Sequence, residues 1–156
     1  MKEHQYKATV EWTGNLGSGT DHYKNYERSH HISIKDKVII QGSSDPAFRG
    51  DPNKHNPEDL LLASLSSCHM LWYLHFCSVN NVIVESYIDH ATATMMEEES
   101  GRGFFKEVVL SPSIRVQQPE MIAKAIALHQ KANEYCFIAN SVNFPVRHLP
   151  QVSAGE

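Results

Sequence analysis

The stretch NPEDLLLASLSSCHMLWYLHFC, from Asn56 to Cys77, is the most apolar run of the chain and decides the expected fold. Asn56 suits the cap of a helix whose first turn contains Pro57 and the acidic Glu58. Leucine, aromatic and other apolar side chains then occupy nearly every face of that helix. We therefore expect a buried central helix that a β-sheet or a partner chain covers on several sides.

Alternating apolar and polar residues predict strands on both sides of this helix. The elements expected outside it are a strand at 6–13, a hairpin within 30–44, an antiparallel hairpin of two long strands at 82–96 and 104–117, a second helix at 119–135 and a last strand at 143–148. This order is typical of an α+β fold rather than of a parallel doubly wound sheet. A chain of 156 residues is long enough for one domain with its own core.

Composition and charge exclude several classes of protein. With 41% apolar and 21% charged residues, the chain is neither disordered nor fibrous. A net charge of −4 argues against binding to nucleic acid or to an anionic membrane surface. The N-terminus lacks the apolar segment of a signal peptide, and the central run carries serines and histidines that are costly in lipid. We expect a soluble, cytoplasmic protein with no membrane partner.

The three cysteines, Cys68, Cys77 and Cys136, are an odd number in a chain without an export signal. On burial pattern alone, Cys68 is more often a packed hydrophobe than a reactive thiol. A guanidinium near the thiol would favour the thiolate, and Arg49 is the nearest basic residue before the helix. Glu58 lies ten residues before Cys68, about 15 Å along the helix, so the two cannot touch without an intervening side chain.

Two segments together resemble a known family. NPEDLLLASLSSC, residues 56–68, resembles the signature helix of the OsmC/Ohr family of thiol-dependent hydroperoxide reductases, and HQKANEYCFIANSV, residues 129–142, resembles the second-cysteine segment of that family. The resemblance extends over most of the chain. It implies a single OsmC-like domain over residues 1–156, with antiparallel sheets around a buried central helix in an intertwined homodimer.

The resemblance also implies a role for individual residues. Cys68 matches the peroxidatic cysteine and Cys136 the resolving cysteine, while Glu58 matches the glutamate that holds a catalytic arginine. Arg49 is the first candidate for that arginine and Arg28 the second. The implied function is reduction of organic hydroperoxides, and of hydrogen peroxide in addition, without a cofactor or metal. An external dithiol, of lipoyl type or a small thiol, would recycle the enzyme.

One other function and the roles of His69 and Cys77 have to be considered beside this interpretation. The chain could be a non-catalytic small-molecule-binding or interaction domain of the same fold, with packed and unreactive cysteines. His69 follows Cys68 where many relatives carry an apolar residue. It either tunes the thiol or is a core histidine with a backbone partner. Cys77 faces nearly the opposite side of the helix from Cys68 and is expected to be packing, since a metal site with His75 has no recognised spacing.

Overall fold

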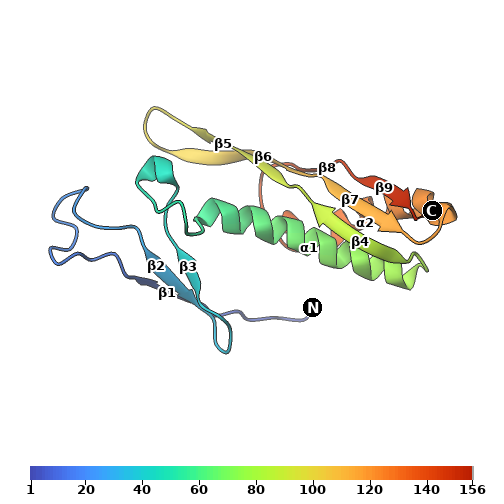
Figure 1. The fold of residues 1–156 in the computed structure, drawn as a ribbon, viewed down its shortest axis with the longest axis horizontal. Helices are drawn as coiled ribbons and strands as arrows, with labels where there is room; N and C mark the ends of the chain where they lie inside the picture. The colour runs from blue at the N-terminus through green and yellow to red at the C-terminus, as the bar shows by residue number, and fades with distance from the viewer. Residues whose placement is uncertain (156) are drawn as a thin grey trace. The chain divides into compact units, whose positions relative to one another are not determined.

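The structure is a computed structural model that describes residues 1–155. The chain forms two compact units, one from Met1 to Leu61 and the other from Leu62 onward. The helix α1, Pro57–Val79, begins in the first unit and continues in the second. Figure 1 labels the elements, which together form a mixed α+β fold, as the sequence predicts.

The first unit contains a three-stranded antiparallel sheet in the order β1-β2-β3. Its strands are β1 (Thr9–Trp12), β2 (His30–Ser33) and β3 (Ile40–Gly42), followed by the short 3-10 helix η1 (Pro46–Phe48). The predicted strand and hairpin are therefore present with shorter bounds. Asp36 turns the hairpin with a φ of 61°, a left-handed conformation that Asp tolerates better than most residues. Every residue of β1 is exposed, so this strand buries no side chain within the unit.

Reciprocal hydrogen bonds fix the start of α1. The Asp59 amide donates to Asn56 Oδ1 at 2.7 Å, and the Asn56 amide donates to Asp59 Oδ2 at 3.3 Å. This arrangement is a capping box in which each side chain satisfies a backbone group that the helix leaves free. The predicted N-cap is confirmed. The helix ends at Val79, directly before Asn80 and Asn81.

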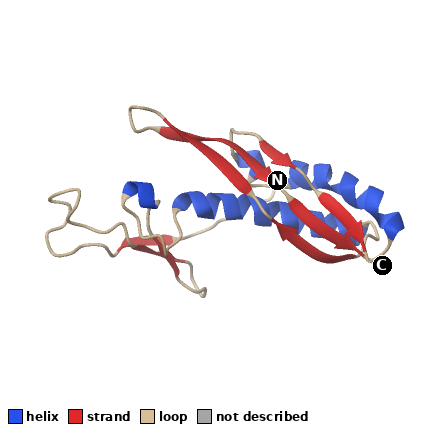
Figure 2. Ribbon diagram, turned by 45° about the horizontal axis from the view of Figure 1, so that its top comes forward, coloured by secondary structure: helices blue, strands red, loops and turns tan. Residues whose placement is uncertain are grey.

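The second unit holds two mixed three-stranded sheets, in the orders β4-β7-β9 and β5-β6-β8. Their strands are β4 (Val84–Asp89), β5 (Thr92–Glu97), β6 (Gly103–Leu110), β7 (Pro112–Val116), β8 (Val146–His148) and β9 (Gln151–Ala154). Neighbouring strands β5 and β6, and β4 and β7, pair antiparallel, whereas β8 and β9 join β6 and β7 in parallel. Figure 2 shows these strands in red alongside the blue helices of the same unit.

The two long strands expected from the sequence are each broken in the middle. Asp89 ends β4 and accepts hydrogen bonds from the Ser111 amide at 2.7 Å and from the Ser66 hydroxyl at 2.5 Å. Pro112 then begins β7, and its missing N–H prevents β6 from continuing as the same ladder. The halves of each predicted strand therefore enter different sheets. Strand β9 was not predicted from the sequence.

The second predicted helix begins as a 3-10 turn, η2 (Pro119–Met121), and continues as α2 (Ile122–Tyr135). A third short turn, η3 (Ala139–Ser141), follows it. The buried side chains of α2 are Ala125, Leu128, His129 and Ala132, at the spacing of one helix face. Ile126, by contrast, is 47% exposed and does not belong to this face.

The buried side chains of α1 also lie mostly on one side of the helix. They are Leu65, His69, Tyr73, Phe76 and Cys77, and the last three belong to the hydrophobic core formed with α2 and β7. Leu71 and Val79, by contrast, are 63% and 61% exposed. One chain therefore covers α1 on one side only, although its sequence predicts burial on several. By length and composition α1 could also cross a membrane, a criterion that core helices of soluble proteins meet as well.

Candidate functional site

The structure brings Cys68 and Cys136 together from different elements of the second unit. Cys68 is half-buried in the middle of α1, and Cys136 is 1% exposed at the C-terminal end of α2. The pKa of Cys136 is raised to about 11, first by burial and then by an interaction of its thiol with Cys68. Both cysteines are free thiols. The two predicted redox residues are thus neighbours, 68 positions apart in the chain.

Backbone hydrogen bonds hold Cys136 in place at the end of α2. Its amide donates to the Asn133 carbonyl at 3.2 Å, and its carbonyl accepts from the Asn140 amide at 3.0 Å. The Ala139 amide donates to Cys136 Sγ at 3.4 Å, which lowers the pKa of the thiol less than burial raises it. Cys136 is therefore a protonated thiol at neutral pH.

Cys77 lies elsewhere on α1, nine residues beyond Cys68. It is 1% exposed, and burial raises the pKa of its thiol. The Tyr73 hydroxyl lies beside this thiol and partly offsets that rise, although no well-formed hydrogen bond satisfies the hydroxyl. The interpretation of Cys77 as packing is confirmed by its burial in the core.

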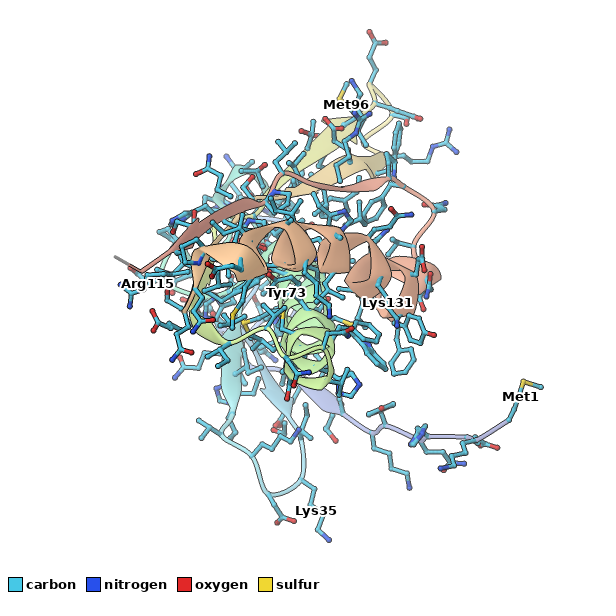
Figure 3. All side chains as sticks on the ribbon, turned by 90° about the vertical axis from the view of Figure 1, so that its right-hand side faces the viewer. Met1, Lys35, Tyr73, Met96, Arg115 and Lys131 are labelled. Atoms are coloured by element: carbon cyan, nitrogen blue, oxygen red, sulfur yellow. The ribbon has the colours of Figure 1, made fainter. Side chains whose placement is uncertain are left out.

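Three buried or half-buried imidazoles from different elements of the second unit lie together, and we call them the histidine cluster. The cluster consists of His69 from α1, His129 from α2 and His148 from β8. His69 Nε2 and His129 Nδ1 are 3.0 Å apart and share a hydrogen bond. The His69 ring stacks on His148 at a centroid distance of 4.5 Å. Tyr73 stacks on His129 at 3.9 Å, and Figure 3 shows Tyr73 between the ribbons of α1 and α2.

Burial keeps the histidine cluster uncharged at neutral pH. It lowers the pKa of His69 to about 3 and that of His129 to about 4, and repulsion from the neighbouring imidazoles adds to the effect. The pKa of His148 is also lowered by burial, although the Asp89 carboxylate opposes the change. His69 Nδ1, His129 Nε2 and His148 Nε2 have no hydrogen-bond partner among the described residues. The predicted core location of His69 is confirmed, but its partner is His129 and not the backbone.

The two candidate arginines lie in the first unit. They line one cavity of about 250 Å³ together with Glu27, Ser29 and Asp51. Arg28 donates hydrogen bonds to the carbonyls of Tyr26 and Tyr23 at 2.6 and 2.9 Å, so much of its guanidinium is already occupied.

Arg49 has a positive φ of 65° at the end of η1, and its guanidinium lies 6.0 Å from the centre of the Tyr23 ring. Within residues 1–155, neither Arg49 nor Arg28 forms an ion pair with Glu58. Glu58 occupies the first turn of α1, as expected. The predicted carboxylate–arginine pair is thus not formed within the described part of one chain.

His129 and His148 were missed in the sequence because they come from separate elements of the chain. The ten histidines are scattered, and no spacing links these two to His69. In the part of the chain that the structure describes, no group of three or more histidine, cysteine or acidic side chains is arranged to hold a metal ion. The cluster is therefore a stacked arrangement of imidazoles and not a chelating one.

Comparisons with known proteins agree with this fold and these motifs. A sequence model of a family described as OsmC-like protein matches residues 50–148. An OsmC-like protein of unknown function from Vibrio cholerae is 28% identical, with a TM-score of 0.83 over 97% of this chain and 100% of that one. An organic hydroperoxide resistance protein from Elizabethkingia anophelis is 17% identical, with a TM-score of 0.69 over 99% of both chains.

The organic hydroperoxide resistance protein OhrB of Bacillus subtilis is 18% identical, with a TM-score of 0.62 over 96% of this chain and 98% of that one. No curated protein sequence matches the chain. The structural likeness therefore extends over nearly the whole chain, at low sequence identity.

Proposed function

The chain belongs to the OsmC family, and from this premise we propose that it is a thiol-dependent peroxidase that reduces organic hydroperoxides. The observation that carries the proposal is the interaction between the thiols of Cys68 and Cys136. Two structural relatives with the same fold are named organic hydroperoxide resistance proteins, which supports the substrate class.

The first step is oxidation of Cys68. Its thiolate attacks one oxygen of the hydroperoxide, and the O–O bond breaks. Cys68 becomes a sulfenic acid, while the leaving alkoxide takes up a proton and departs as an alcohol. Sulfur loses two electrons in this step and the peroxide gains them. The half-buried position of Cys68 leaves the thiol open to a small substrate.

The second step joins the two cysteines. Cys136 attacks the sulfur of the Cys68 sulfenic acid, a disulfide forms, and the hydroxyl group leaves. Because the raised pKa of Cys136 keeps it protonated, its proton must pass to the departing hydroxide, which leaves as water. An external dithiol then returns both cysteines to thiols by two exchange reactions and is itself oxidised to a disulfide.

An arginine would complete the site by stabilising the Cys68 thiolate and binding the peroxide oxygens. Arg49 is the better candidate because the guanidinium of Arg28 already binds two backbone carbonyls. We propose that the pair with Glu58 forms in a homodimer. The exposed side of α1, with Leu71 and Val79, and the exposed strand β1 are surfaces that a second copy would cover.

Peroxide consumption in the presence of a dithiol tests this function. Wild-type protein should consume an organic hydroperoxide, Cys68→Ser should not, and Cys136→Ser should form one sulfenic acid per chain without sustained turnover. Cys77→Ser is the matched control because Cys77 is on the same helix and should retain full activity. If Cys68→Ser consumed peroxide as fast as wild type, the mechanism through Cys68 would be wrong. If wild-type protein consumed none, the chain would be better described as a non-catalytic binding domain.

A further inference from the structure

We propose that the hydrogen bond between His69 and His129 positions Cys136 against Cys68 for disulfide formation. This inference rests on the proposed function, because it assigns a positioning role within the same redox site. The two histidines touch neither the peroxide nor the sulfur atoms in this scheme. They act through the helices on which the cysteines lie.

The positions of the two histidines relative to the cysteines support this role. His69 is the residue after Cys68 on α1, so the two share one helical turn. His129 is seven residues before Cys136, two turns along α2 and on nearly the same side. The 3.0 Å hydrogen bond therefore links the two helices that carry the redox pair.

The surroundings of this bond restrict its movement. His69 is 1% exposed and His129 is 3% exposed. The His148 ring packs on His69, and the Tyr73 ring packs on His129. Closely packed interiors transmit small shifts of one element to its neighbours. A hydrogen bond held between stacked rings can thus fix the relative rotation of α1 and α2.

The chemical cost of the cluster argues for more than packing. Buried imidazole nitrogens without partners cost free energy that apolar side chains of similar size would not. The hydrogen bond also needs one ring nitrogen with a proton and one without, a requirement that two uncharged imidazoles meet. A disulfide in turn requires Cβ atoms about 3.5–4.5 Å apart, so a modest rotation of α2 would prevent its formation.

The test uses an aromatic disulfide, 5,5′-dithiobis(2-nitrobenzoate), on protein with Cys77→Ser. Attack by Cys68 releases one thionitrobenzoate anion and leaves a mixed disulfide. Attack by Cys136 on that mixed disulfide releases the second anion and forms the Cys68–Cys136 bond. The first rate reports the reactivity of Cys68, and the second reports the approach of Cys136. No peroxide takes part.

Amide substitutions separate hydrogen bonding from packing at each histidine. At position 129 the bond uses Nδ1, which the shorter asparagine amide mimics, whereas glutamine places its amide too far along the side chain. At position 69 the bond uses Nε2, so glutamine reaches the partner and asparagine is too short. The variants are therefore His129→Asn against His129→Gln, and His69→Gln against His69→Asn.

We expect His129→Gln and His69→Asn to slow the second release about tenfold, the order of one lost hydrogen bond. His129→Asn and His69→Gln should stay within about threefold of the parent rate, and the first release should be unchanged in all four. The proposal is overturned if the two amides at a position behave alike, or if both releases slow together. Thermal unfolding of each variant shows that it is folded at the temperature used.

The outcome is separable from that of the proposed function. Wild-type protein could fail to reduce hydroperoxides while only His129→Gln and His69→Asn slow the second release. In that case the peroxidase assignment fails and the positioning role stands. If wild-type protein reduces hydroperoxides but the pattern is absent, only the positioning role fails.

Discussion

The helix α1 carries two cysteines whose surroundings differ in kind. Cys68 is half-buried and interacts with a second thiol, whereas Cys77 is packed in the core beside the Tyr73 hydroxyl. Both lie in the same apolar run and share the same backbone conformation. The comparison teaches that the chemistry of a thiol depends on the groups that neighbouring elements place beside it, and that the helix alone does not determine it.

The most direct way to break this comparison is to remove each thiol in turn. Cys68→Ser should lower the rate of hydroperoxide reduction at least about a thousandfold, because a hydroxyl cannot replace the thiolate nucleophile. Cys77→Ser should keep the wild-type rate. The measurement is dithiol-dependent loss of hydroperoxide. Equal losses in the two variants would mean that Cys77 takes part in the redox cycle.

Acid should destabilise the core on the buried side of α1, where Cys77 lies and where His69 meets the other two residues of the histidine cluster. The folded pKa values of His69 and His129, about 3 and about 4, lie below the unfolded value of 6.5. Between the folded and unfolded pKa values, the unfolded chain binds more protons than the folded chain. The contribution of the uncharged histidines to the free energy of unfolding is therefore fully present above pH 6.5 and is lost as the pH falls below that value. Between pH 7 and pH 5 each histidine should remove about 2 kcal/mol from the free energy of unfolding.

Denaturant unfolding at the two pH values measures this loss. The double variant His69→Gln/His129→Asn has no imidazole at these positions and should lose about 4 kcal/mol less than wild type over the same interval. His148, whose pKa is lowered by burial and raised by Asp89, stays in both proteins and contributes equally. An equal pH dependence in the two proteins would show that the cluster is not the source.

Alkylation of the native protein sharpens the comparison further. Cys68 is partly exposed, whereas Cys77 is buried and reacts only when the core opens by local unfolding. Iodoacetamide should therefore modify Cys77 about a hundredfold more slowly than Cys68 at neutral pH. Mass spectrometry of peptides after timed quenching gives both rates. In denaturant the two rates should converge, and persistence of the difference there would point to a cause other than burial.

The smallest expected effect comes from the start of the helix that both cysteines share. Asn56→Ala removes the side-chain acceptor of the Asp59 amide and should cost about 1 kcal/mol in the free energy of unfolding. Asn56→Asp keeps an acceptor and should cost less. Because the cap lies three turns before Cys68, neither variant should change the ratio of the two alkylation rates.

Local sequence signals predicted the parts of this fold that depend on neighbouring residues. Asn56 and Pro57 marked the start of α1, and the spacing of Cys68 and Cys136 within two motifs suggested the redox pair. The structure confirms the cap and brings the two thiols together. Their roles in catalysis stay predictions.

The same local signals could not predict features that depend on residues distant in the sequence. The alternation of apolar and polar residues continues through the breaks at Asp89 and Ser111, so it gives no sign that the two halves of each strand pair in different sheets. The four residues of β9 are too few for a clear pattern. The histidine cluster joins three elements, and nothing local to His129 indicates that His69 lies opposite.

The Asp89 carboxylate, at the end of β4, is one of two side-chain contacts that hold α1 near Cys68. Asp89 accepts the Ser66 hydroxyl, two residues before Cys68, while His69, one residue after it, is bound to His129. The two contacts reach different neighbours, β4 and α2, from either side of the reactive residue. These two hydrogen bonds together restrict rotation of α1 about its own axis. They therefore fix the direction in which the Cys68 thiol points.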